Sequence, residues 1–236
     1  MVFYPINKIK NSLAYQVTFG RQGYKKGEGH KLEELELLFG YIEKEDVNSV
    51  KKLLEKGVNP NSQDKYGYTP LMVATYYNQP DIVRILMEKG SNLKTQNYNG
   101  ITALMDASMK CRIEIVNEML KYADPKVVNI KSGEGYSALM AGARGGCTKV
   151  VEYLIKNGAE VNMQDSDGWT PLHEATSKGF VDIVSLLIRY GADLNIRDSE
   201  GYTPLGIATE WYKGDLAIKE QLKEVITTLK EFGGSL

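Results

Sequence analysis

Apolar residues along the chain recur in paired short stripes that are separated by turns rich in glycine and aspartate. In one example Leu71 precedes Ala74 by three residues, and the run DIVRILMEKG follows from Asp81. Residues three or four apart share one face of a helix, so each stripe predicts a short amphipathic helix. Thr-Pro before the first stripe suits a helix start, and glycine after the second suits a left-handed helix end.

The paired stripes repeat at an almost constant spacing. Five turn-and-helix segments are separated by 33, 35, 33 and 33 residues: GYTPLMVA from Gly67, GITALMDA from Gly100, GYSALMAG from Gly135, GWTPLHEA from Gly168 and GYTPLGIA from Gly201. One helical pair cannot bury both of its apolar faces alone. The period therefore predicts stacked pairs that share one continuous core.

This pattern resembles the ankyrin repeat, which has a period of about 33 residues and the signature T-P-L-H-x-A. The resemblance covers roughly residues 34–236. It implies an all-α solenoid of six stacked helix pairs, with an N-terminal cap, four internal units and an extended closing unit. We expect the repeat domain to span 32–236, with units at 32–66, 67–99, 100–134, 135–167, 168–200 and 201–236. The extra length of the last unit, around 211–219, predicts a longer loop or an extended helix.

Residues 1–31 lie outside the repeats and carry six basic residues against one acidic residue. The alternation over 13–19 suits a strand that pairs with 2–6, and 20–29 reads as a glycine-rich linker. A hairpin of this kind is not stable alone and must lean on the first repeat or on a partner. The alternative is a flexible tail.

Composition and charge limit the classes of partner that the sequence favours. The formal net charge is −1, which favours neither nucleic acid nor a membrane surface as the partner. No stretch approaches the roughly 18 to 20 apolar residues that span a bilayer. The N-terminal residues MVFYPINKIK do not resemble a secretory signal, so we expect a cytoplasmic protein, although export without a leader would leave no trace.

Catalytic and metal-binding patterns are not found in the sequence. His173 occupies the histidine of T-P-L-H, where the family implies a structural role, and His30 lies in the predicted linker. Cys111 and Cys147 fall at nearly equivalent places in adjacent units, about 10 Å apart, so we expect free thiols. The glycines of 142–146 end a helix and lack the Lys-Ser/Thr of a phosphate loop. We expect no enzyme activity, metal or cofactor.

The family resemblance implies that turn tips and first helices line a concave face that binds other proteins. We call the thirteen residues predicted there the binding face: Tyr66, Tyr68, Tyr76, Tyr77, Ile101, Met109, Lys110, Tyr136, Arg144, Trp169, Lys178, Tyr202 and Trp211. Tyrosine, tryptophan, methionine and arginine are enriched at interface centres. Tyr136 and Trp169 equally suit packing between adjacent hairpins. The pattern predicts aromatic clusters at both ends and a mixed-charge centre.

The predicted function is a non-catalytic module that binds a partner protein as an adaptor or inhibitor. One alternative is a toxin-neutralising, immunity-type protein. Another is a structural module that self-associates through the N-terminal arm, and an enzyme or small-molecule receptor is the third. We expect the free protein to be a monomer, and the sequence does not identify the partner.

Overall fold

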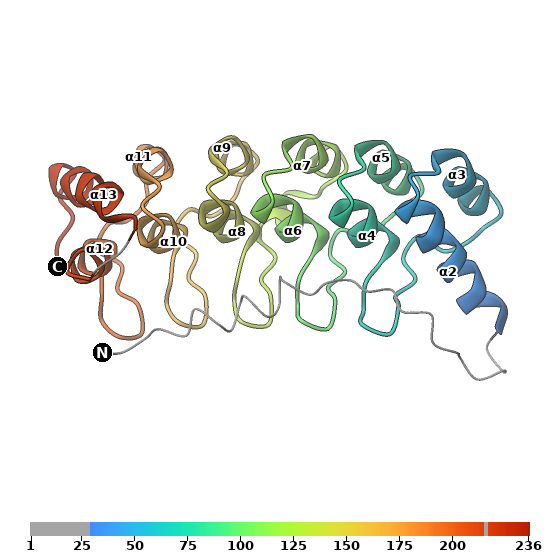
Figure 1. Ribbon diagram of the computed structural model, residues 1–236, viewed down its shortest axis with the longest axis horizontal. Helices are drawn as coiled ribbons and strands as arrows, with labels where there is room; N and C mark the ends of the chain where they lie inside the picture. The colour runs from blue at the N-terminus through green and yellow to red at the C-terminus, as the bar shows by residue number, and fades with distance from the viewer. Residues whose placement is uncertain (1–28, 215–216) are drawn as a thin grey trace.

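The computed structural model describes residues 29–214 and 217–236, and shows twelve α-helices within them, arranged as six antiparallel pairs in one row (Figure 1). The hairpin or tail predicted at the N-terminus falls outside these residues. The predicted all-α solenoid is confirmed. The pairs are α2 (Gly29–Glu43) with α3 (Val47–Glu55), α4 (Pro70–Tyr76) with α5 (Pro80–Glu88), α6 (Ala103–Met109) with α7 (Ile113–Leu120), α8 (Ala138–Gly145) with α9 (Thr148–Lys156), α10 (Pro171–Ser177) with α11 (Val181–Arg189), and α12 (Pro204–Tyr212) with α13 (Lys219–Glu231).

The first helix of each of the five later pairs begins at a hydroxyl cap. Thr69 Oγ1 accepts a hydrogen bond from the backbone N–H of Met72, and Pro70 occupies the first turn. The equivalent caps are Thr102, Ser137, Thr170 and Thr203. Each cap satisfies a backbone donor that the helix leaves unpaired. The local sequence therefore fixes where these helices start.

Leucines at one equivalent position of successive units anchor the shared core. Each exposes at most 2% of its surface, and all belong to a single hydrophobic cluster: Leu71, Leu104, Leu139, Leu172 and Leu205. In Figure 1 the first helices form one row and the second helices another, with the turns extending from the first row. The core runs along the whole row, as expected for quasi-one-dimensional stacking.

Side-chain amides join the loops of neighbouring units. Asn61 Nδ2 donates to the carbonyl of Gly90, and Asn61 Oδ1 accepts from the N–H of Asn92. Asn129 makes the same pair of bonds with Gly158 and Glu160. Each amide satisfies two backbone groups of the next unit, so the closing loops are held in register along the stack.

Three elements depart from the regular repeat: a 3₁₀ helix after α7, a longer first helix in the last pair, and the start of α2. The 35-residue spacing between Gly100 and Gly135 is accommodated by a 3₁₀ helix, η1 (Pro125–Asn129). Helix α12 has nine residues, whereas α4, α6 and α10 have seven, so the extra length of the last unit lies partly in the helix. Helix α2 begins at Gly29, which places His30 on a helix and corrects its assignment to a linker.

The expectation of free thiols is wrong, because Cys111 and Cys147 form a disulfide with a Cα–Cα distance of 4.9 Å. Counted from the turn glycines, Cys111 corresponds to Gly146 and Cys147 to Arg112, so the two cysteines occupy consecutive positions of the repeat. Gln79 is the residue equivalent to Cys147 in an earlier unit, and its Nε2 donates to the carbonyl of Ile42 in the preceding unit. A side chain at this position can therefore contact the preceding unit. This offset brings the two cysteines together across the unit boundary.

Candidate protein-binding face

The turn tips are held by aspartate side chains and by backbone bonds between neighbouring units. Asp165 Oδ1 accepts from the N–H groups of Asp167 and Trp169, which closes its turn. The N–H of Ser199 donates to the carbonyl of Asp167 at 2.9 Å, and the N–H of Tyr98 donates to that of Tyr66 at 3.2 Å. Side chains on the tips are thus presented from a fixed backbone.

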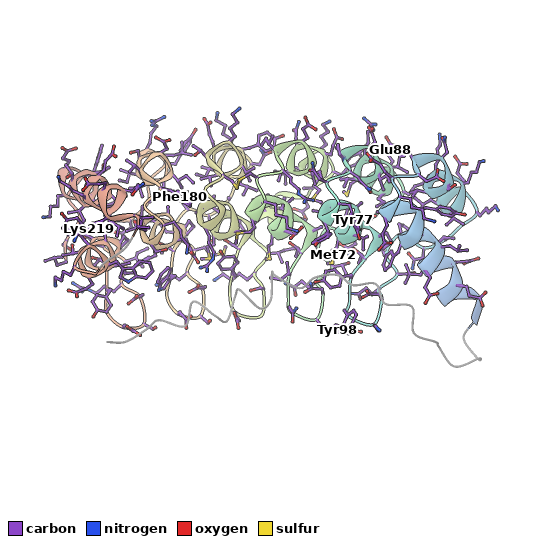
Figure 2. The ribbon with its side chains drawn as sticks, viewed as in Figure 1. Met72, Tyr77, Glu88, Tyr98, Phe180 and Lys219 are labelled. Atoms are coloured by element: carbon purple, nitrogen blue, oxygen red, sulfur yellow. A yellow bond between two sulfur atoms is a disulfide. The ribbon has the colours of Figure 1, made fainter. Side chains whose placement is uncertain are left out.

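Tyrosines on the tips are exposed. Tyr66 exposes 52% of its surface and Tyr202 exposes 41%. Tyr98 exposes 76%, more than any other large hydrophobic residue of the described part of the chain, and Figure 2 shows it among the turns. Large rings in water without a folding role are typical of interaction surfaces. Sequence reasoning missed Tyr98 because it examined the two residues beside each turn glycine and omitted the preceding position.

The end of α4 carries a second aromatic group. The rings of Tyr76 and Tyr77 meet edge to face with centroids 5.3 Å apart. Lys110 Nζ lies 4.1 Å from the centroid of the Tyr76 ring, and it also pairs with Asp106 at 2.9 Å. Tyr77 is more exposed, and its hydroxyl donates to Glu43 at 3.3 Å. The structure therefore brings Tyr76, Tyr77 and Lys110 of the binding face together.

Two aromatic residues of the binding face are buried. Tyr136 exposes 5% of its surface and Trp169 exposes 7%, so both pack between units and offer little area to a partner. Trp211 is half-buried, with its ring centroid 6.5 Å from that of Trp169. The remaining predicted residues are also half-buried: Tyr68, Ile101, Met109 and Lys178.

A buried ion pair occupies the centre of the face. Arg144 Nη1 lies 3.1 Å from Glu174 Oε2, and the Glu174 side chain is almost completely buried. Burial raises the pKa of Glu174 to about 7, which outweighs the opposing effect of Arg144. Burial also raises the pKa of Tyr136, and the neighbouring Glu174 adds to that shift. The Arg144 guanidinium thus forms an ion pair inside the protein, which leaves it less available to a partner.

His173 has the structural role that was predicted. It is fully buried, and its Nδ1 accepts from the Thr170 N–H at 3.1 Å. Its Nε2 lies 3.3 Å from the carbonyl of Tyr202 in the next turn. Burial lowers the pKa of His173, which favours the neutral ring that can accept at one nitrogen and donate at the other.

The raised pKa of Glu174 predicts that stability falls as pH rises. Its pKa is about 7 in the folded chain against an ordinary value of 4.5, so between these values the folded state binds a proton that the unfolded state has lost. The free energy of unfolding should therefore drop across this window, by on the order of 2 kcal/mol. Urea unfolding at pH 5 and pH 8 measures this drop.

Glu174→Gln is the control for this pH dependence, because the amide does not titrate. Asp165, with a pKa of about 6, contributes in the same direction and remains in the variant. The drop between pH 5 and pH 8 should therefore shrink without vanishing. An unchanged drop in Glu174→Gln would show that Glu174 is ionised in the folded protein throughout.

The described residues hold neither a metal-binding cluster nor a helix that could cross a membrane. Within 29–214 and 217–236 no group of three or more histidine, cysteine, aspartate or glutamate side chains is placed to hold a metal ion. The helices of this same part of the chain are too short and too polar to cross a bilayer. The exposed tyrosines remain the feature that points to a function.

Comparison with known proteins identifies the family. The family model described as "Ankyrin repeats (3 copies)" matches residues 38–131, 93–165 and 139–226. An ankyrin repeat protein of fowlpox virus (strain NVSL) is 42% identical over 53 residues, which are 22% of this chain and 7% of that protein. This chain thus matches a small part of the length of its viral relative.

Solved structures agree with the assignment. The ankyrin repeat protein EF0377 is 28% identical with a TM-score of 0.74, over 84% of this chain and 98% of that one. An ankyrin repeat domain from Acinetobacter baumannii AYE is 27% identical with a TM-score of 0.72, over the same shares. The ankyrin domain of Bcl-3, a member of the IkappaB family, has the same fold at 22% identity, with a TM-score of 0.73 over 84% and 86%. With the capped turns and stacked helix pairs described above, these matches show that the chain belongs to the ankyrin-repeat family.

Proposed function

We propose that this protein binds a partner protein through the exposed part of its binding face. Ankyrin repeats are generally modules for protein–protein interaction, and their fold is generally non-catalytic. The observation that carries the proposal is the exposure of tyrosines on turn tips and at the end of α4, whereas the hydrophobic core of the stacked helices is buried. Tyrosine offers a large contact area and has few rotatable bonds to immobilise.

We expect the most exposed aromatic residues to dominate binding. Tyr66, Tyr77 and Tyr202 are the most exposed aromatics of the binding face, and Tyr98 joins them at the tips. Tyr136 and Trp169 are buried, so we assign them to packing. Lys65 Nζ lies 5.1 Å from the centroid of the Tyr66 ring, so a positive charge accompanies this exposed ring at the tip.

Loss of the tip tyrosines should abolish capture of the partner. We expect wild-type protein to retain a partner from native lysate and Tyr66→Ala/Tyr98→Ala to retain at least tenfold less, because one hot-spot truncation can cost about 2 kcal/mol or more. Pull-down with quantitative mass spectrometry measures the ratio. Thermal unfolding of the variant should match that of the wild type, since neither ring is buried.

Tyr122→Ala is the matched control, because Tyr122 is also exposed, at 47%, but follows α7 outside the binding face. It should retain the partner fully. Equal retention by all three proteins would refute our location of the site. An activity assay of the purified partner separates the roles. An inhibitor or a toxin-neutralising protein suppresses that activity, whereas an adaptor leaves it unchanged.

A further inference from the structure

The disulfide joins the helix connections of two adjacent units. Cys111 follows the last residue of α6 by two positions, in the left-handed backbone region with φ of 58°. Cys147 is the N-cap residue of α9 in the next unit. An ideal Cβ on Gly145 would lie 2.3 Å from the carbonyl oxygen of Met109. This close approach of α8 to α6 needs glycine, and it brings the two connections within disulfide reach.

The two sulfur positions differ in access. Cys111 is exposed, whereas Cys147 exposes 4% of its surface. Each Sγ lies 3.7 Å from one backbone carbonyl oxygen of the other unit, that of Gly145 for Cys111 and that of Met109 for Cys147. Thiol–disulfide exchange requires a thiolate to reach one sulfur directly. Because Cys111 is exposed and Cys147 is buried, an external thiol should reach Cys111 more readily in the folded protein.

The position of Cys147 at a helix N-terminus makes it the better leaving group of the two cysteines. When Cys111 is attacked, Cys147 departs as a thiolate at the N-terminus of α9, a helix of nine residues whose N-cap makes no side-chain hydrogen bond. Helix N-termini stabilise anions, and a stabilised thiolate leaves faster. The access to Cys111 and the helix N-terminus at Cys147 thus favour the same direction of attack.

We infer that the Cys111–Cys147 pair is a thiol–disulfide exchange site that accepts a dithiol at Cys111. A thiolate of the dithiol forms a bond to Cys111 Sγ, the protein disulfide breaks, and Cys147 leaves with the electron pair and is then protonated. The second thiol of the dithiol attacks the mixed disulfide and releases Cys111. The dithiol is oxidised by two electrons to its own disulfide, and the protein gains two thiols. The reverse reaction uses an oxidised dithiol of the same class.

Exchange at this site would act on the binding face. Met109 and Lys110 precede Cys111 directly, and Arg144 stands three residues before Cys147. The disulfide therefore fixes the separation of two parts of the binding face that lie in different units. This consequence rests on the proposed function, whereas the exchange chemistry does not.

The rate of reduction by dithiothreitol tests the proposal on the full chain, after equilibration with excess oxidised dithiothreitol. We expect reduction in native buffer to speed up in proportion to the dithiothreitol concentration. A rate that levels off with concentration would show that the chain must unfold first, and would overturn the proposal. Two free thiols remaining after the oxidation step would overturn it as well.

The position of attack is tested by trapping. Oxidised protein is treated with reduced glutathione as a monothiol probe, quenched with iodoacetamide and digested for mass spectrometry. Glutathione on Cys111 with the alkyl group on Cys147 is the expected product. The opposite labelling would refute attack at Cys111. Neither readout involves a partner, so failure here leaves the tyrosine experiments unaffected.

Discussion

Replacing Arg144 with alanine is expected to lower the free energy of unfolding by about 3 kcal/mol at pH 8. Glu174 is buried, and the variant removes the guanidinium that lies 3.1 Å from its carboxylate. A buried carboxylate without a partner avoids the cost of its charge only by binding a proton. At pH 5, where the proton is available, the loss should therefore be smaller. Urea unfolding at both pH values measures the two losses.

Lys156→Ala provides the matched control for Arg144→Ala. It removes an ion pair with Glu152, whose atoms lie 2.7 Å apart, but both partners are largely exposed. Exposed pairs contribute little to stability, so this variant should unfold almost like the wild type at either pH. A similar loss in the two variants, or a loss in Arg144→Ala that is the same at pH 5 and pH 8, would contradict the role assigned to Glu174.

The fold could be predicted from the sequence because each unit carries its own local signals. The hydroxyl caps, the turn aspartates and the glycines with positive φ recur in register, and each specifies backbone geometry regardless of the rest of the chain. The buried leucines then follow from helical periodicity alone. The role of His173 was implied by the family resemblance, and its hydrogen bonds to its own cap and to the adjacent turn account for that role.

The candidate site could be predicted only in part, because exposure depends on contacts between units. Tyr136 and Tyr202 occupy the same position after a turn glycine, yet Tyr136 is buried and Tyr202 is exposed. Among the described residues, the turn of Tyr202 is the last of the five, and the structure shows no later turn against it. Arg144 was predicted in a mixed-charge centre that faces a partner, whereas it pairs with Glu174, 30 positions away, whose side chain is buried between units. The residue type at one position therefore does not reveal which residues of neighbouring units will contact it.

The disulfide between Cys111 and Cys147 should add to the stability of the folded chain. Replacing both Cys111 and Cys147 with serine should lower the free energy of unfolding by about 2 to 4 kcal/mol relative to the oxidised wild type. The crosslink spans 36 residues, and removing it frees the unfolded chain to explore more conformations. Urea midpoints of oxidised wild type, reduced wild type and the double serine variant measure the effect.

The location of the loss separates this effect from a general weakening of the core. Each unit of a repeat protein is stabilised by its neighbours, so a crosslink between two units should matter most at their boundary. Hydrogen exchange should therefore speed up first in α6 to α9 in the reduced wild type and in the double serine variant alike, with α4 and α12 less affected. Because serine differs little from reduced cysteine in size, agreement of these two proteins assigns the loss to the crosslink. Equal urea midpoints for oxidised and reduced wild type would mean that stacking alone holds the boundary.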